Sequence, residues 1–183
     1  MASTNSIENF KSNFGGGTRN NRFEVIANWP AGISIDDDDN KFKIFATSLP
    51  RSDIGTITVG YRGRTINFAG DRTYGTWEIS IYDDNNAKNI WTAMHTWKEK
   101  IDGHVTHLKT TTSSGTQNFS YSDLQTTWTV NQLGLNGDII RSIEMYKCWP
   151  SVVGGIVLDQ SSSTQASFSV TMVFDYFDIL TGA

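Results

Sequence analysis

The sequence predicts a mainly β fold, an antiparallel β-sandwich or barrel with one flanking α-helix. About eight segments alternate apolar and polar residues, as half-buried strands do, and turn residues separate them. One further stretch repeats its apolar residues every three or four positions, which indicates a single amphipathic helix. Strands joined by short turns pair antiparallel, and such sheets form sandwiches or barrels.

The alternation is clearest in Thr76–Tyr82 and Ser167–Phe177, and we expect each to form one strand. Ile54–Gly60 and Arg64–Ala69 are expected to form a hairpin around Tyr61-Arg62-Gly63, because glycine readily takes a positive φ. Further strands are expected at Phe23–Ala27, Lys41–Leu49, Thr127–Leu133, Ile139–Cys148 and Gly155–Asp159.

Turn and stop signals set the ends of these segments. Trp149-Pro150 is expected to end the strand before it, since proline donates no ladder hydrogen bond. Asn136-Gly137 indicates the turn of a second hairpin. Val105–Tyr121 is rich in Thr, Ser and Gly, so we expect an exposed loop there.

The predicted helix ends at Gly103, and Asp83 or Asn85 is expected to cap its start. Its apolar stripe must pack on a sheet. The stripe consists of Ala87, Ile90, Trp91, Met94, Trp97 and Ile101.

The 183 residues suit one domain. We expect residues 1–20 to form a flexible, polar N-terminal arm with a hinge at Gly15–Gly17, and residues 21–183 to form a single domain. The arm has no apolar core of signal-peptide length, and no apolar run approaches the length of a membrane span. We therefore expect a soluble protein made in a cytoplasm, with no membrane anchor.

The net charge is −4, and no basic run is present. Duplex DNA is held mainly by Lys and Arg on its phosphates, so this chain is a poor candidate for gripping nucleic acid. An acidic chain is instead suited to forming a surface that must not bind nucleic acid tightly.

Residues with catalytic or metal-binding chemistry are few and poorly arranged. His104 and His107 have the spacing of two metal ligands but lack a third, and the single Cys148 is expected to be a small buried hydrophobe. The Asp36–Asp39 cluster lacks the spacing of a calcium loop. We predict no metal, no cofactor and no catalytic residue.

Two of the three carboxylates Asp71, Glu78 and Asp83 could be imagined as the paired carboxylates of a glycosidase, but nothing in their spacing requires this. No nucleophile or phosphate-loop motif occurs. The sequence therefore predicts that the protein is not an enzyme.

The polar face of the last predicted strand carries small hydroxyl residues. Such a face can line solvent or meet another subunit. Long alternating strands also leave edges that need protection, and closing a ring of subunits into one barrel removes those edges. The face consists of Ser167, Ser169, Thr171, Val173 and Asp175.

Several motifs together resemble the tail tube proteins of contractile-tailed bacteriophages of the T-even type, over roughly Arg22 to Phe177. They are Ala46-Thr47-Ser48-Leu49-Pro50, Asn67-Phe68-Ala69-Gly70-Asp71-Arg72-Thr73, Cys148-Trp149-Pro150 and Phe174-Asp175-Tyr176-Phe177. The chain departs from that family in its long arm, in Asp36–Asp39 and in the 105–121 loop.

The resemblance implies hexameric rings stacked into a rigid tube inside a contractile sheath, a fold shared with type VI secretion tubes. Strands of all subunits would form one barrel around a channel that conducts genome DNA into the host. The implied partners are further copies of the chain, the tail sheath protein, and baseplate and tail terminator proteins. The implied location is the virion tail, after assembly in the host cytoplasm.

The resemblance also implies that a long hairpin, Leu49–Arg64, protrudes and reaches the adjacent ring; an ordinary hairpin with a solvated tip is the alternative. An apolar centre with a charged rim suits an interface. Its expected contact residues are Leu49, Arg51, Asp53, Ile54, Ile57, Val59, Tyr61, Arg62 and Arg64.

Asp71 and Arg72 follow the second arm of the hairpin. Arg72 is a candidate for an ion pair between subunits, and Asp71 could take part in it or could cap a local turn.

Two other functions stay open. A tube subunit of a phage-derived contractile injection system, or a tube initiator in the baseplate, could share these motifs. A monomeric carbohydrate-binding β-sandwich is the alternative of a different class.

Overall fold

The computed structural model describes residues 7–15, 17–33, 35, 43–84, 89–104 and 121–181. The predictions for Asp36–Asp39, His107 and residues 105–120 lie outside this part of the chain. The described strands are β1 (Phe23–Ile26), β2 (Ile44–Thr47), β3 (Ser52–Tyr61), β4 (Arg64–Tyr74), β5 (Trp77–Tyr82), β6 (Thr126–Leu133), β7 (Ile139–Val153), β8 (Ser167–Val173) and β9 (Tyr176–Thr181).

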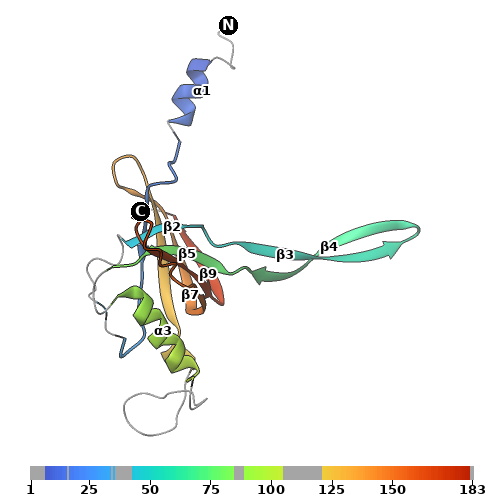
Figure 1. Cartoon of the computed structure of the whole chain (residues 1–183). Coiled ribbons are helices and arrows are strands. Elements are labelled where there is room, and N and C mark those ends of the chain that lie inside the picture. The colour runs from blue at the N-terminus through green and yellow to red at the C-terminus, as the bar shows by residue number, and fades with distance from the viewer. Residues whose placement is uncertain are drawn as a thin grey trace.

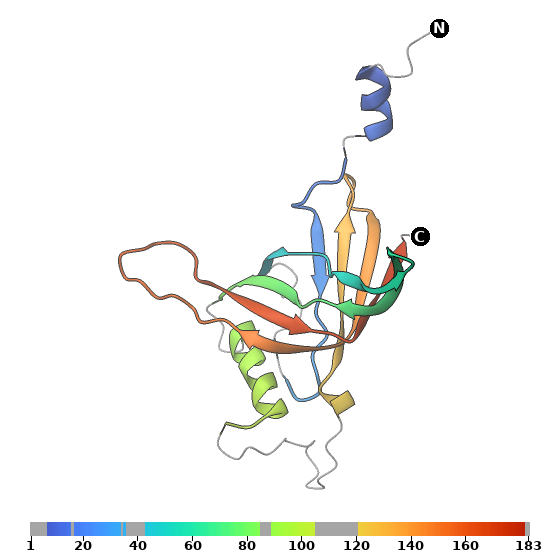
Figure 2. The ribbon, with the colours of Figure 1, turned by 90° about the vertical axis from the view of Figure 1, so that its right-hand side faces the viewer.

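All pairings between these strands are antiparallel, which confirms the predicted mainly β class (Figure 1). The strand order β1-β6-β7-β8-β5-β2, with β9 also on β7, forms the body, and β3 and β4 form a separate two-stranded sheet. Figure 2 shows the body as two layers whose strands cross. One layer holds β1, β6, β9 and the first part of β7, and the other holds β2, β5, β8 and the last part of β7.

The core lies between these layers and is rich in tryptophan. Trp128 from β6 is fully buried, with ring centres 5.5 Å from Trp29 and 5.9 Å from Trp77, both edge-on. Trp97 from the helix lies 6.4 Å from Trp128. Edge-on aromatic packing contributes beyond the area it buries. The largest side chains of both layers thus close one common core.

Strand β7 belongs to both layers. Arg141–Tyr146 pairs with β9, whereas Trp149–Val153 pairs with β8. Lys147, with φ of 58°, lies where the strand changes layer. The expected strand end at Trp149-Pro150 is therefore wrong. Beyond Cys148 only β8 pairs with β7, and a strand with one free edge tolerates a proline.

The predicted strand Ser167–Phe177 is in fact two strands, β8 and β9. The chain leaves one layer at Phe174 and joins the other, and the Asp175 N–H donates to the Tyr146 carbonyl (3.1 Å) at the break. Phe174 stays buried, so the apolar alternation continues across the break and gave no signal of it. The short strand expected at Gly155–Asp159 is also wrong, because this segment lies in an exposed loop.

Helix α3 (Ile90–Ile101) closes one end of the body. Its N-cap is Asn89, whose Oδ1 accepts from the Thr92 N–H (2.8 Å), and not Asp83 or Asn85 as predicted. The apolar stripe is confirmed where it is described, since Ile90, Met94 and Trp97 are buried.

Two features project from the body in different directions (Figures 1 and 2). One is the β3–β4 hairpin, whose turn residues Arg62 (φ 48°) and Gly63 (φ 76°) both take the left-handed conformation of a two-residue hairpin turn. The other is a second α-helix, α1 (Ile7–Phe14), in the segment expected to be a flexible, polar arm. The predicted flanking helix is α3, and α1 is an additional helix that the sequence did not predict, while the flexibility of the arm stays a prediction.

Candidate assembly surfaces

The described residues offer little chemistry. Among them, no group of three or more His, Cys, Asp or Glu side chains is arranged to hold a metal ion. His104 forms an exposed pair with Glu99, Nε2 to Oε2 3.2 Å. Cys148 is buried, and burial raises the pKa of its thiol to about 12, so the thiolate needed for reactivity is scarce. No described helix has the length and apolar character that crossing a membrane requires.

The three carboxylates considered for glycoside chemistry stand on separate elements. Asp71 lies on the projecting strand β4, and Glu78 is exposed on β5. Asp83 follows β5 and accepts a hydrogen bond from Asn89 Nδ2 (3.3 Å), beside the helix start. This arrangement does not present two carboxylates across a substrate.

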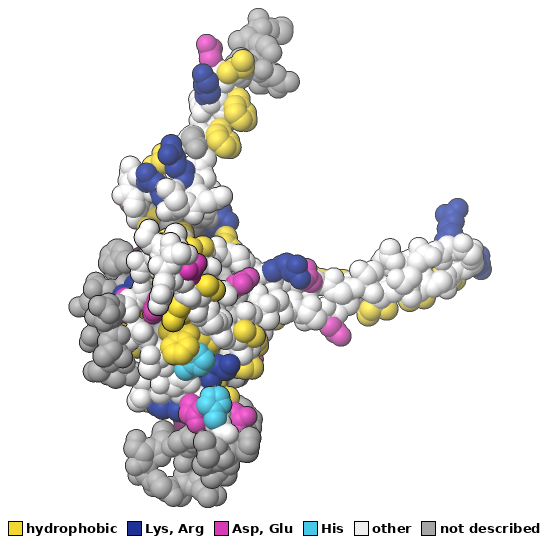
Figure 3. All heavy atoms as spheres, viewed as in Figure 1, with side chains coloured by type: hydrophobic (Ala, Val, Ile, Leu, Met, Phe, Trp, Pro, Cys, Tyr) yellow, Lys and Arg dark blue, Asp and Glu magenta, His cyan; other side chains and the backbone are white. Residues whose placement is uncertain are grey.

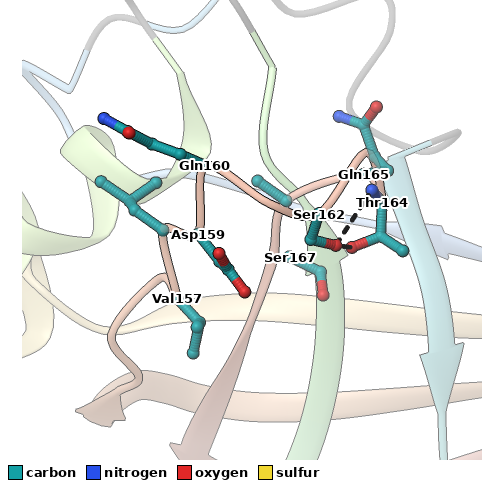
Figure 4. Close-up of a pocket in the computed structure, with 9 residues that line it drawn as sticks. Val157, Asp159, Gln160, Ser162, Thr164, Gln165 and Ser167 are labelled. Atoms are coloured by element: carbon teal, nitrogen blue, oxygen red, sulfur yellow. Dashed lines mark hydrogen bonds between the residues drawn. The ribbon is translucent and has the colours of Figure 1, made fainter.

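A cleft of about 640 Å³ lies within the loop between β7 and β8 (Figure 4). Its polar groups bond mainly to one another. Asp159 Oδ1 accepts from the Ser161 N–H (2.9 Å) and hydroxyl (2.7 Å), which lowers the pKa of Asp159, and Ser162 and Thr164 share a hydrogen bond (2.9 Å). Val157 and Leu158, by contrast, are each 85% exposed. The loop resembles a solvated turn with an apolar tip more than a ligand site.

The outward face of β5 and β8 is polar and carries no Lys or Arg. Ser167 and Ser169 are exposed there and Thr171 is half-buried, as the alternation predicted. Asp175 lies beyond the end of β8 and is not part of the face. The directly opposed pairs are Glu78 with Thr171, Ser80 with Ser169, and Tyr82 with Ser167.

The β3–β4 hairpin has one apolar and one polar face. Directly opposed residues of an antiparallel pair point to the same side, so the register fixes both faces. The polar face pairs Thr56 with Ala69, Thr58 with Asn67, and Gly60 with Thr65. The other face pairs Ile57 with Phe68, Val59 with Ile66, and Tyr61 with Arg64. We call its apolar members, Ile57, Val59, Tyr61, Ile66 and Phe68, the apolar ladder.

The other described residues leave the apolar ladder exposed. Its exposed fractions run from 42% at Ile66 to 57% at Tyr61, although its strands are regularly paired. Figure 3 shows these side chains as a stripe along the hairpin, with basic side chains at its tip. An isolated two-stranded ribbon is only marginally stable in water. The hairpin therefore presents an apolar surface that needs a partner.

Charged side chains along the hairpin bond locally. Arg51 Nε lies 3.1 Å from Asp53 Oδ2, and both side chains are exposed. The Arg62 guanidinium lies over the Tyr61 ring at 5.3 Å. Arg72 Nη1 donates to Ser52 Oγ (3.3 Å), so this arginine also has a partner within its own chain.

The sequence singled out Leu49, Ile54, Ile57, Val59 and Tyr61 as contact residues, and the structure leaves all of them 42–57% exposed on or beside the hairpin. Sequence reasoning missed Ile66 and Phe68 on the second strand. Numbering outward from the predicted three-residue turn would have paired Val59 with Thr65, one residue out of register. The turn in the structure is Arg62-Gly63, so Ile66 pairs with Val59 and Phe68 with Ile57, and all four lie on one face.

These features define a class of protein before any comparison: a mainly β structural subunit with a projecting apolar ribbon. Comparison with known proteins makes the class specific. Residues 18–180 match the model of the family described as phage tail tube protein. Because this match covers most of the chain, the chain belongs to the phage tail tube protein family.

Curated relatives agree. The chain is 28% identical to the tail tube protein gp19 of Enterobacteria phage T4 over 139 residues, 75% of this chain and 80% of the relative. It is 24% identical to the tail tube protein of Serratia phage KSP90 over 164 residues, 88% of each chain. The resemblance inferred from the motifs is therefore confirmed.

Solved structures share the fold at low identity. The tube-terminating cap of the anti-feeding prophage matches with a TM-score of 0.60 and 15% identity, over 90% of this chain and 91% of the cap protein. A chain of the sheath–tube complex of the PVC extracellular contractile injection system matches with a TM-score of 0.56 and 13% identity, over 96% and 98%. The fold of this chain is therefore shared with chains of these two assemblies.

Proposed function

We propose that this chain is the inner-tube subunit of a contractile phage tail. It forms hexameric rings that stack into a tube inside the sheath, and the channel conducts genome DNA. The half-exposed apolar ladder carries this proposal, because soluble monomers rarely keep contiguous apolar surface exposed without a partner. A second copy in the adjacent ring would cover it. In this proposal the subunit acts through its shape and through the stability of the polymer, and it catalyses no reaction.

The outward face of β5 and β8 suits a channel wall. Its Ser and Thr side chains are wetted and uncharged, and Glu78 is the only charged member of the face described above. Binding to DNA comes mainly from cations on phosphates, so a wall of hydroxyl groups with one carboxylate per copy lets the polymer slide. We therefore place this face toward the lumen and expect a net negative potential there.

Ring closure would use the free strand edges of the body. Among the described strands, β2 pairs only with β5, so its other edge is available for a strand of the neighbouring copy. Joining the sheets of all copies into one barrel leaves no such edge exposed. Arg72 and Asp71, at the root of the hairpin, remain our candidates for an ion pair between copies.

The sheath protein, a baseplate and a tail terminator are the further partners of this proposal, within the virion tail. The fold likeness to a cap and to a tube complex does not separate a tube subunit from a baseplate initiator or from a tube of an injection particle. Copy number per particle separates them, since a tube needs many copies and an initiator one ring.

The proposal is tested by deleting residues 52–62, which removes strand β3 and one side of the apolar ladder. We expect a folded body with unchanged near-UV circular dichroism that no longer forms tubes under electron microscopy. Long tubes from this variant would contradict the assignment of the hairpin. A wild-type protein that stays monomeric beside a baseplate nucleus and binds a sugar saturably would favour the carbohydrate-binding alternative.

A further inference from the structure

The N-terminal helix α1 carries an apolar stripe that the described part of the chain leaves exposed. Ile7, Phe10 and Phe14 are 74%, 65% and 59% exposed, and α1 has no buried residue. Their spacing of three and four places them on one face of the helix. The rings of Phe10 and Phe14 stack with centres 5.3 Å apart, so the two form one continuous apolar surface (Figure 3).

An eight-residue helix is too short to be stable alone in water. The apolar ladder on the hairpin also lacks a covering surface, and an isolated two-stranded ribbon is only marginally stable in water without one. A helix laid on a sheet is a standard way to bury both. Figures 1 and 2 show α1 and the hairpin leaving the body in different directions, so one copy does not bring them together.

We propose that α1 of one copy docks on the apolar ladder of a second copy. This inference rests on the proposed function, because it names the element that covers the hairpin when it reaches the adjacent ring. The ladder is covered by α1 of a second copy; binding of α1 to the sheath protein is the alternative that the experiment below distinguishes.

The two surfaces match in length. Eight helical residues span about 12 Å at 1.5 Å per residue. The ladder from Ile57 to Tyr61 spans about 13 Å at 3.3 Å per residue. From Ile7 to Phe14 the stripe itself rises about 10.5 Å, so it is slightly shorter than the ladder and covers most of it.

The charges set the direction of docking. Glu8 lies in the first turn of α1 and Lys11 in the last. The tip of the hairpin carries Arg62 and Arg64, and Asp71 lies toward its root. With the start of α1 over the tip, Glu8 lies nearer the arginines and Lys11 lies nearer the root. The reverse direction would put like charges together, which costs stability at close range.

Cysteine pairs test the contact. Copies carrying Ile7→Cys are mixed with copies carrying Val59→Cys, assembled and mildly oxidised. The native Cys148 is buried, so we expect it to form no disulfide under these conditions. We expect a disulfide-linked dimer of one copy of each variant. The matched control is Thr58→Cys, one residue away on the polar face, and Ile66→Cys and Phe68→Cys scan the register along the ladder.

The outcomes separate the two proposals. Tubes without any link between Ile7→Cys and the ladder cysteines overturn the docking of α1 and leave the tube function standing. A link to the Thr58→Cys control at equal yield, or a link to the sheath protein only, overturns it as well. Failure of every variant and of the wild type to assemble overturns both proposals.

A second variant gives a quantitative readout. Phe10→Asp places a charge in the stripe, and we expect the critical concentration for tube formation to rise about tenfold or more, because a buried ring is lost. Ser12→Asp, on the opposite side of α1, is the control and should leave it nearly unchanged. Equal effects of the two substitutions would contradict docking through this face.

Discussion

Strands β5 and β3 are both built from alternating residues, yet they end in different environments. In β5, Trp77, Ile79 and Ile81 are fully buried while the residues between them are exposed or half-buried. In β3 nine of ten residues are exposed, the apolar ones included. Alternation therefore specifies an amphipathic strand without specifying what covers it. In β5 the cover comes from the same chain, and for β3 we propose that it comes from another copy.

The same contrast separates the two helices. The stripe of α3 is buried in the body, and its Trp97 Nε1 donates to the Leu124 carbonyl (2.8 Å). The stripe of α1 is exposed throughout. Substitutions in the body should change the free energy of unfolding, and substitutions in the projections should change assembly.

The largest effect on unfolding is expected for Trp128→Ala, at the centre of the tryptophan cluster. The side chain is fully buried, so its removal should cost roughly 3–5 kcal/mol of unfolding free energy. Since small domains have about 5–15 kcal/mol in total, the variant should be close to unfolded. Denaturant unfolding of the purified monomer measures this, and a loss below 1 kcal/mol would contradict the assignment of the core.

A smaller effect is expected for Asn89→Ala, which removes the cap of α3. Loss of the hydrogen bond to the Thr92 N–H should cost about 1 kcal/mol. The midpoint of denaturant unfolding should fall while the tube-forming concentration stays the same, because the cap lies in the body. Asn89→Ser, which restores a capping oxygen, serves as the control, and an equal loss with serine would argue against capping.

The smallest effect concerns pH. Burial first, and then Lys98 and His104, lower the pKa of His95 below 6.5. The unfolded chain therefore binds the proton more tightly, so stability falls as pH drops below about 6.5. His95→Gln should flatten this dependence slightly in thermal unfolding between pH 7 and pH 5. A wild-type melting temperature that rises as the pH is lowered from 7 to 5 would contradict the predicted direction. So would a variant whose melting temperature depends on pH as strongly as that of the wild type.

Much of the fold could be predicted because it depends on local patterns. The burial of Trp77 and Trp97 follows from periods of two and three to four residues. Gly63 indicated the hairpin turn, although the turn has two residues, Arg62-Gly63, and not the three that were predicted. The two misses at strand ends share a cause. Pro150 lies inside β7, and Phe174 lies at the break between β8 and β9, because both segments pass from one layer to the other. Such layer changes depend on tertiary packing, which local periodicity does not record.

The candidate surfaces were predicted less completely. The resemblance and the turn located the first arm of the hairpin, including Val59, but the register that adds Phe68 becomes certain only in three dimensions. Helix α1 was missed because its segment is polar overall and its apolar residues are only Ile7, Phe10 and Phe14. Three apolar residues in a polar segment give a weak periodic signal.

The most direct test of the central claim compares Val59→Asp with Thr58→Asp by negative-stain electron microscopy at rising protein concentration. The two positions are adjacent on β3 and face opposite sides, so added charge and strand propensity are nearly matched. The account predicts hollow tubes or six-fold rings for the wild type and for Thr58→Asp, and folded but unassembled protein for Val59→Asp. Equal tube formation by both variants would contradict the claim that the apolar side of the hairpin is completed by another copy of the chain.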